Sequence, residues 1–199
     1  MPKLLLATNN KGKMREYKQL LQELPFEMVS LAEQGITTEV HEVGGSLEEN
    51  ARLKATGIAR ESQLVVLADD SGLEVDALGG KPGPLSARYA GAGASDKDRI
   101  DYLLAKLKGV PWEKRSARFR CVIAIATPDG KVELCSGECR GVITFEPRGE
   151  EGFGYDPIFY FPELDKTMAE LPLTIKNQVS HRGQAARQAC QVLRRKGNL

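Results

Sequence analysis

The chain has few of the residues that build metal clusters. Its 199 residues include only four cysteines and two histidines, and no C-x-x-C pair occurs. Cys135 and Cys139 would lie about 13 Å apart on an extended strand, at a rise of about 3.3 Å per residue, so they could not share one metal ion without a bend. A zinc site is therefore not expected, and reduced thiols buried as small apolar side chains are favoured.

Long hydrophobic runs and an excess of charge of one sign are missing too. No segment approaches the roughly 18 continuous apolar residues of a membrane span, and the first residues carry no signal-peptide pattern. Lys and Arg number 28 against 27 Asp and Glu, for a formal net charge of +1. Because nucleic-acid binders usually have a clear basic excess, we expect a cytoplasmic protein that binds neither membrane nor nucleic acid. A local basic pocket for one small polyanion fits this balance.

The apolar pattern predicts an α/β chain without repeats or long linkers, whose length suits one large domain or two small lobes. Helical spacing of apolar residues predicts four helices, which follow residues 8–13 and open near Ser46, near Ser95 with Asp98, and near Ser180. Their predicted buried stripes are, in chain order, Met14, Tyr17, Leu20, Leu21 and Leu24; Leu47, Ala51, Ala55 and Ile58; Ile100, Leu103, Leu104 and Leu107; and Ala185, Ala189, Val192 and Leu193. Residues 79–83 are expected to form a loop. The order of elements predicts a mixed sheet with helices around it. Strand patterns occur at residues 3–8, 26–31, 65–68, 118–127, 131–143 and 158–161, and Pro128-Asp129-Gly130 is predicted to join the two long β-runs as a hairpin turn.

The most informative segment is Ala68-Asp69-Asp70-Ser71-Gly72, which follows the apolar run at residues 64–67. Two adjacent carboxylates, a hydroxyl and a glycine are thus expected where a buried strand ends. Because isolated buried charge is costly, this pair indicates that a cation or a reacting group balances it. Together with the phosphate-binding patterns described next, the pair predicts metal-assisted chemistry on a nucleoside phosphate.

Two segments at helix starts could bind phosphate. Thr8-Asn9-Asn10-Lys11-Gly12-Lys13 precedes the first helix, whose N-terminus presents unpaired N–H groups to an anion. The spacing is not that of a Walker A loop, so a solvated turn is the alternative. Ser180-His181-Arg182-Gly183 opens the last helix, with Lys176 just upstream. Cationic side chains in a first turn are unfavourable against the helix dipole unless an anion is bound, and an exposed helix start is the alternative.

The loop Gly152-Phe153-Gly154-Tyr155-Asp156-Pro157 combines two glycines, two aromatic residues and an acid. Glycines permit close approach of the backbone to a ligand. Phe153 could stack on a base, and Asp156 could accept hydrogen bonds from its ring N–H groups. The alternative is a β-turn whose aromatic side chains pack inward.

Further polar residues surround the start of the second helix. Glu42 and Glu49-Asn50 flank it, and Glu49 also has a structural explanation as the capping-box partner of Ser46. Lys54 lies about one and a half turns into the helix, where the pattern puts it on the solvent side. It is either another phosphate ligand or an ordinary surface lysine.

In this order, the segments resemble the inosine triphosphate pyrophosphatase family, which hydrolyses the triphosphates of non-standard purines. The match rests on residues 8–13, 49–54, 68–73, 153–157 and 180–183, together with Ser86-Ala87-Arg88-Tyr89. Each piece alone is modest, but the ordered set is specific and covers nearly the whole chain.

The resemblance implies hydrolysis of ITP, dITP and XTP to the monophosphate and pyrophosphate by one domain spanning residues 1–199. It also implies an elongated mixed α/β fold with two lobes around a central substrate cleft, and a homodimer. The catalytic acid of the family falls on Asp70, and its magnesium ligands fall on Asp70 and Glu42. The implied substrate contacts are Thr8, Asn9, Asn10, Lys11, Gly12, Lys13, Lys54, Ser71, Phe153, Gly154, Tyr155, Asp156, Lys176, His181 and Arg182.

Physical chemistry agrees with these roles. Magnesium prefers carboxylate and phosphate oxygens, and Asp70 would take the proton of the nucleophile. Hypoxanthine and xanthine present an oxygen at C6 and an N–H at N1, so a donor such as Arg182 or His181 would select them against adenine. Four lysines would stabilise the phosphate charge in the transition state: Lys11, Lys13, Lys54 and Lys176.

Three other functions stay open on the sequence: a non-catalytic nucleotide sensor, a pyrophosphatase for another modified nucleotide such as a modified pyrimidine, and a nucleic-acid-binding domain. The acidic pair argues against the sensor, because a phosphate binder gains little from carboxylates near its ligand. The balanced charge argues against nucleic acid.

Overall fold

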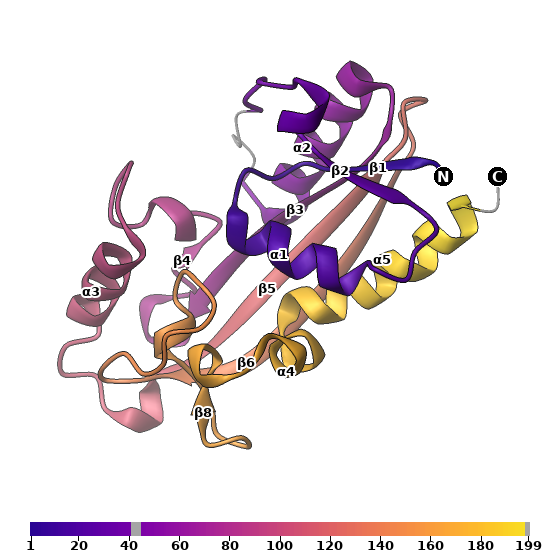
Figure 1. The fold of residues 1–199 in the computed structure, drawn as a ribbon. Coiled ribbons are helices and arrows are strands. Elements are labelled where there is room, and N and C mark those ends of the chain that lie inside the picture. The colour runs from indigo at the N-terminus through magenta and orange to yellow at the C-terminus, as the bar shows by residue number, and fades with distance from the viewer. Residues whose placement is uncertain (41–44, 198–199) are drawn as a thin grey trace. The chain divides into compact units, whose positions relative to one another are not determined.

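The computed structural model describes residues 1–40 and 45–197 as a mixed α/β fold (Figure 1). Glu42, one of the two predicted magnesium ligands, lies outside the described residues. The helices are α1 (Lys11–Leu20), α2 (Leu47–Ser62), α3 (Asp96–Lys106), α4 (Leu173–Val179) and α5 (His181–Gly197). The strands are β1 (Lys3–Leu6), β2 (Glu27–Ser30), β3 (Val65–Val75), β4 (Pro82–Gly83), β5 (Ser116–Ala126), β6 (Val132–Ile143), β7 (Phe159–Phe161) and β8 (Lys166–Thr167).

The strands form one mixed sheet, which confirms the predicted fold class. Its order is β2-β1-β3-β5-β6-β7-β8, with β4 paired to β3. β1 runs parallel to β2 and β3, whereas β3–β4, β6–β7 and β7–β8 are antiparallel pairs. The predicted hairpin turn joins β5 to β6, and Gly130 N donates to Thr127 O at 2.9 Å. The expected loop at 79–83 includes β4, because Pro82 and Gly83 pair with β3.

Contacts within the chain divide it into two compact units. Unit 1 comprises Met1–Asp70, Cys121–Gly137 and Arg182–Leu199. Unit 2 comprises Ser71–Arg120 and Glu138–His181. The one-domain assignment, and the cleft between lobes that the resemblance implies, stay predictions.

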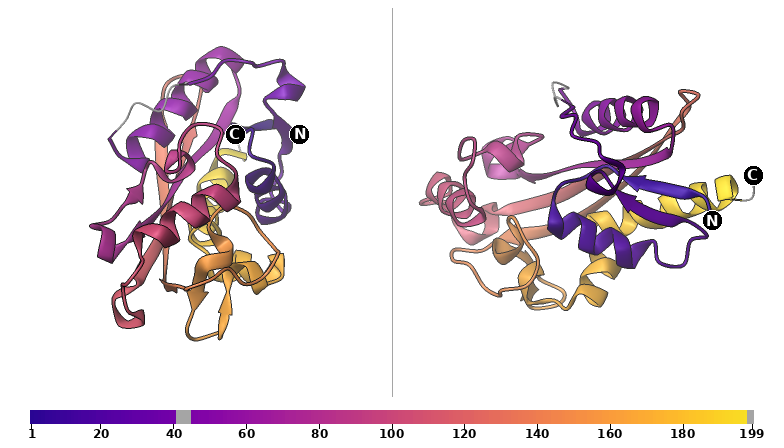
Figure 2. Two further views of the ribbon diagram at one scale, coloured as in Figure 1. Left: turned by 90° about the vertical axis from the view of Figure 1, so that its left-hand side faces the viewer. Right: turned by 45° about the horizontal axis from the view of Figure 1, so that its top comes forward.

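Unit 1 buries both faces of its part of the sheet. Because side chains alternate along a strand, Leu4 and Leu6 pack with α1 and α5 on one face, while Leu5 and Val66 pack with α2 on the other. The right-hand view of Figure 2 shows α2 and α5 on opposite sides of the sheet. These strands are therefore continuously apolar, as strands covered on both faces must be.

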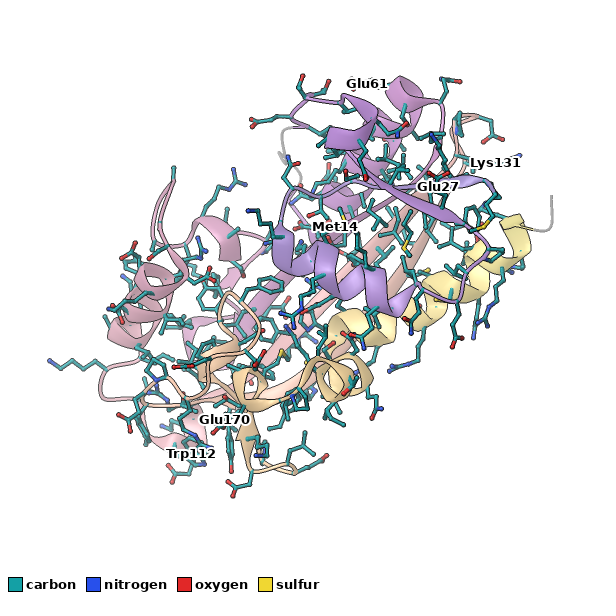
Figure 3. All side chains as sticks on the ribbon, viewed as in Figure 1. Met14, Glu27, Glu61, Trp112, Lys131 and Glu170 are labelled. Atoms are coloured by element: carbon teal, nitrogen blue, oxygen red, sulfur yellow. The ribbon has the colours of Figure 1, made fainter. Side chains whose placement is uncertain are left out.

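The apolar stripes predicted for the helices of unit 1 are confirmed. Met14, labelled in Figure 3, comes from α1 and packs against the same core as α5. The predicted stripe of α2 is fully buried at Leu47, Ala51, Ala55 and Ile58. The predicted stripe of α5 is buried at Ala185, Ala189, Val192 and Leu193.

Unit 2 has a separate core, in which Ile100 and Leu103 of α3 pack with Leu73 and Val75 of β3. The helix α4 was not predicted, because its seven residues are too few to show a helical period. Arg115 is buried here, and its guanidinium donates to the carbonyl oxygens of Leu107, Val110, Ile143 and Thr144.

The prediction that the acidic pair lies where a strand ends is wrong. β3 continues through Asp69 and Asp70 to Val75. The apolar pattern resumes beyond the polar residues, and Leu73 and Val75 are fully buried in unit 2. The strand can carry the carboxylates because partners within the protein bind them, as described below.

Replacing Ser95 by alanine is expected to lower the free energy of unfolding by about 1 kcal/mol. Ser95 Oγ accepts from Asp98 N at 3.1 Å, and Asp98 Oδ2 accepts from Ser95 N at 2.9 Å, so a capping box starts α3 at the predicted place. Urea denaturation measures the loss. Ser136→Ala, on the exposed side of β6, is the matched control and should stay within about 0.5 kcal/mol of the parent. An equal effect of both variants would contradict the capping role.

Candidate active site

The topology of unit 1 explains where its polar segments gather. β1 lies between β2 and β3, and the helices after β1 and before β3 cover opposite faces of the sheet. In α/β proteins, ligands bind at the carboxyl ends of the strands where the chain changes face in this way. Ala7 N donates to Leu67 O at 2.9 Å, so residues 8–13 leave β1 beside the start of the acidic segment.

Residues 8–13 contain the start of the first helix, as predicted. Asn10 is the N-cap of α1, and its Oδ1 accepts from Lys13 N at 3.0 Å. Thr8 Oγ1 accepts in turn from Asn10 N at 3.1 Å. The first turn of α1 carries no acidic residue, so the positive end of the helix dipole keeps its attraction for an anion.

Asp69 is the centre of a buried charged cluster. Lys13 Nζ lies 3.0 Å from its Oδ1, and Arg182 Nε lies 3.2 Å from its Oδ2. Arg182 Nη1 also pairs with Glu16 Oε2 at 2.7 Å. Asp69, Glu16 and Arg182 are each at most 2 % exposed. The residue that was expected to meet a substrate base is thus bound to two carboxylates of unit 1.

The cluster shifts the pKa of its members strongly. Burial alone would raise the pKa of Asp69, but the charges of Lys13, Arg182 and Lys54 outweigh it and hold that pKa well below its usual range. Burial opposes the charge of Arg182 as well, yet Glu16 and Asp69 raise its pKa. Because the pKa of Asp69 is depressed, its ionised form stabilises the fold above the unfolded pKa, and this contribution is lost as the pH falls through the folded pKa.

These contacts bear on two expectations about charge. The acidic pair was expected to be balanced by a cation or a reacting group, and for Asp69 the cations are Lys13 and Arg182 of the protein itself, while a metal ion at Asp70 stays a prediction. The cationic first turn of α5 was expected to need a bound anion. For Arg182 in that turn, the carboxylates of Glu16 and Asp69 provide the negative charge. Sequence reasoning did not find these partners, because they come from segments far apart in the chain.

Asp70 is bound from α2. Its Oδ2 accepts from Asn50 Nδ2 at 3.0 Å, and its side chain is buried. One helical turn after Asn50, Lys54 Nζ donates to Asp69 O at 3.2 Å. The prediction that Lys54 lies on the solvent side is therefore wrong, because it shares a helix face with Asn50. The predicted capping of α2 is half confirmed, since Ser46 Oγ accepts from Glu49 N while Glu49 Oε2 accepts from Gly45 N.

A second polar group is built on the glycine-rich loop of unit 2. Asp156 Oδ2 accepts from Phe153 N at 3.1 Å and pairs with Lys176 Nζ at 2.6 Å. The ammonium group also lies 4.8 Å from the centre of the Phe153 ring. Both charged side chains are buried. A Cβ at Gly152 would lie 2.1 Å from Asp156 Oδ2, which explains why glycine occupies that position.

Three further predicted residues of unit 2 are buried as well: Tyr155, Ser180 and His181. The ring of His181 stacks on Phe119, with centroids 4.6 Å apart and planes 11° apart, and its Nδ1 lies 3.9 Å from Cys139 Sγ. Tyr155 is buried, and its hydroxyl donates to Ser86 O at 2.7 Å. Its side chain thus packs inward, as the alternative interpretation of this loop held. Ser180 immediately precedes α5.

Sequence reasoning missed two members of the unit 1 cluster, Glu16 and Cys121, and it gave Asn50 no separate role. Cys121 Sγ lies 3.8 Å from Asp69 Oδ2, and burial raises the pKa of its thiol to about 12. Glu16 had a usable signal, because it follows Lys13 by three positions and adjoins the buried Tyr17. A glutamate on the apolar side of a helix predicts a buried partner.

The fold and the charged cluster of unit 1 define a class: an α/β protein whose cationic and acidic side chains gather where β1 ends and β3 continues past it. Among residues 1–40 and 45–197, no group of three or more His, Cys, Asp or Glu side chains forms a metal-binding cluster. No described helix is long and apolar enough to cross a membrane.

Comparison with known proteins identifies the family. The model of the Ham1 family matches residues 4–192. A dITP/XTP pyrophosphatase of Desulforamulus reducens is 51% identical over 97% of this chain and 96% of its own length. One from Geobacter sulfurreducens is 54% identical over 93% of each chain. The solved structure of a HAM1 protein from Coxiella burnetii superposes with a TM-score of 0.88 at 42% identity, covering 97% of this chain and 98% of that one. This chain therefore belongs to the Ham1 family.

Proposed function

We propose that this protein hydrolyses the triphosphates of non-standard purines (dITP, ITP and XTP) to the monophosphate and pyrophosphate, and so removes them from the nucleotide pool. The names of the similar proteins support this activity. The structural observation that carries it is the Asp69–Asp70 pair on β3, approached by Lys13 of α1 and by Asn50 and Lys54 of α2.

In the proposal, the positive end of α1 and the lysines of unit 1 bind the phosphates. The N–H groups of the first helical turn, together with Gly12, suit phosphate oxygens. Lys11 is exposed, while Lys13 and Lys54 are held beside Asp69. Such preorganised cations stabilise the charge of the transition state without a cost of reorganisation at the moment of reaction.

Magnesium is the proposed cofactor, held by Asp70 and Glu42. Asp70 fits this role, because it offers a hard carboxylate oxygen beside Asp69, whose own charge Lys13 and Arg182 already balance. A small number of protein ligands also suits magnesium, which keeps several waters and binds substrate phosphates. When bound, the ion would neutralise phosphate charge and orient the triphosphate.

Asp70 is the proposed proton acceptor. As the water oxygen bonds to the α-phosphorus, a water proton passes to an Oδ of Asp70, the anhydride bond between the α- and β-phosphates breaks, and pyrophosphate leaves. Asn50 orients the carboxylate through the hydrogen bond to Oδ2. Ser71, the next residue along β3, is proposed to contact the substrate.

The loop of unit 2 is the proposed base reader. Hypoxanthine and xanthine carry an N–H at N1 and an oxygen at C6, which suit the carboxylate of Asp156 and the ammonium of Lys176. Adenine carries the opposite pattern and would leave this buried pair without matching partners, which supports strong discrimination. We favour Lys176 over Arg182 as the donor to C6, because two nitrogens of Arg182 bind Asp69 and Glu16. Phe153 is proposed to stack on the base, with His181 as a further donor.

Pyrophosphate release from ITP, XTP, GTP and ATP, measured with magnesium and with chelator, tests the proposal. We expect fast, magnesium-dependent release from ITP and XTP and little from ATP or GTP. Tight binding of ITP without release would indicate a nucleotide sensor instead. Release only from other modified nucleotides would indicate a different substrate class.

The homodimer and the cytoplasmic location belong to the same proposal. All four cysteines are free thiols, which suits the reducing compartment that holds the nucleotide pool. Light scattering of the purified protein measures the oligomeric state, and a monomeric mass would contradict the dimer.

A further inference from the structure

The segment Ser86-Ala87-Arg88-Tyr89 has no role in the mechanism above, although the family resemblance partly rests on it. In unit 2, Ser86–Arg88 form one turn of 3-10 helix shortly after β4. Ser86 is buried, and its hydroxyl donates to Gly83 O at 2.6 Å and accepts from Leu73 N at 2.9 Å. One hydroxyl therefore attaches the turn to both β3 and β4.

Close packing of β4 against β3 keeps the Ser86 hydroxyl within hydrogen-bonding distance of both strands. A Cβ at Gly72 would lie 2.3 Å from Gly83 O, a distance that real Cβ atoms do not adopt. Only glycine therefore lets β4 approach β3 here, one residue before the Leu73 amide that binds Ser86. The turn is thus fixed against the part of β3 that directly follows Asp70 and Ser71.

One connection leads from the turn to the glycine-rich loop through Tyr155. This side chain lies in the unit 2 core, and its hydroxyl donates to Ser86 O at 2.7 Å. Phe153 and Asp156 lie two residues before and one residue after Tyr155. The hydrogen bond therefore holds the middle of the loop that is proposed to read the base.

A second connection runs through Asp96, the first residue of α3. Asp96 Oδ2 accepts from Gly154 N at 2.9 Å, and its other carboxylate oxygen pairs with Arg99. Arg99 Nη1 donates to Ala87 O at 3.2 Å, so this chain of contacts also returns to the turn. Gly154 has a φ of +61°, the left-handed region that glycine adopts without strain. In this conformation the Gly154 N–H donates to the Asp96 carboxylate, which lies outside the loop.

We propose that the Ser86–Arg88 turn and Asp96 form a support that holds the Phe153–Asp156 loop in the geometry that reads the purine base. Asp96 and Tyr155 are then positioning residues for base recognition, and Asp96 touches no substrate atom. The inference rests on the proposed function of the loop. It assigns part of the substrate selectivity to the start of α3. None of the residues proposed to read the base belongs to this helix.

The test compares Asp96→Ala with Asp96→Asn and with Asp98→Ala. Asp98 closes the capping box of the same helix, so its loss weakens α3 without touching the loop. For Asp96→Ala we expect KM for ITP to rise about tenfold with kcat within about threefold, as for the loss of one hydrogen bond to a charged acceptor. The amide oxygen of Asp96→Asn can still accept from Gly154 N, so this variant should recover most of the loss. Asp98→Ala should keep the parent KM.

Hydrogen exchange at the Gly154 amide gives a readout that is independent of turnover. It should be faster in Asp96→Ala than in the parent and in Asp98→Ala. Tyr155→Phe should likewise raise KM, whereas Tyr160→Phe, which removes a tyrosine hydrogen bond to Asp165 elsewhere in unit 2, should not.

Two results separate failure of this inference from failure of the proposed function. If the parent protein does not hydrolyse ITP or XTP, the proposed function is wrong. If the parent hydrolyses ITP but Asp96→Ala has the KM and the Gly154 exchange rate of the parent, the support is wrong while the function stands. Equal KM values for Asp96→Ala and Asp96→Asn, both above the parent, would also overturn it, because they would exclude the hydrogen bond as the cause.

Discussion

Asp70→Asn is expected to lower kcat for ITP by about 10³-fold while the protein stays folded, since general-base catalysis contributes about 10²–10⁴-fold. An amide cannot take the proton of the attacking water and offers magnesium no negative charge. The amide oxygen can still accept from Asn50 Nδ2, which binds the carboxylate at 3.0 Å in the parent. Pyrophosphate release at saturating ITP and magnesium measures the effect, and circular dichroism confirms the fold.

Asp76→Asn provides the matched control for this experiment. It makes the same chemical change at an exposed aspartate just beyond β3, whose Oδ2 accepts from Ser116 Oγ at 2.6 Å. Its turnover should equal that of the parent within about twofold, because the change lies outside the proposed site. If Asp70→Asn kept turnover within tenfold of the parent, Asp70 would not be the proton acceptor.

Arg182→Met is expected to have the largest effect on stability, a fall of about 3–5 kcal/mol in the free energy of unfolding. Removing the guanidinium leaves Glu16 and Asp69 as buried carboxylates that have lost a common counter-ion. For a chain of this length, the loss corresponds to a fall of about 6–20 °C in Tm. Urea denaturation and calorimetry at neutral pH measure it.

A double variant shows whether the lost charge balance is the cause. Adding Glu16→Gln to Arg182→Met removes one of the two carboxylates, so it should recover part of the stability, and the coupling energy follows from the double-mutant cycle. Arg194→Met is the control, because Arg194 is 59% exposed and lies 4.0 Å from Glu23. Exposed pairs contribute about 0–1 kcal/mol. A loss in Arg182→Met as small as that in Arg194→Met would rule out a stabilising role for the buried cluster.

The parts of the fold that were predicted from the sequence are those with local signals. The period of the buried stripes located α2 and α5, and Ser95 with Asp98 marked the start of α3. Two long β-runs around a Pro-Asp-Gly turn marked the β5–β6 hairpin. Each signal depends on residues within a few positions of one another, so it can be found without knowing what lies across the fold.

The errors concern partners that are distant along the chain. The acidic pair was expected to end a strand, but Lys13 and Arg182 balance Asp69 and β3 continues. Lys54 was placed toward solvent because helical periodicity alone does not show that its ammonium reaches a backbone carbonyl of β3. The pairing of Lys176 with Asp156 in unit 2 was likewise not found from the sequence, which grouped Lys176 with the phosphate lysines.

By itself, the sequence determined the α/β class, the helix starts, the buried stripes and the ordered segments that carry the family resemblance. Only the tertiary structure decided which charges meet. Arg182 and Glu16 are separated by 166 positions, and Arg182 and Asp69 by 113, so no local pattern couples them. Burial then makes the pairing obligatory, because an unpaired charge in the interior costs several kcal/mol. Pairing between residues far apart in the chain is thus invisible in local sequence patterns, and the same pairing holds the buried charges of the folded cluster in a defined geometry.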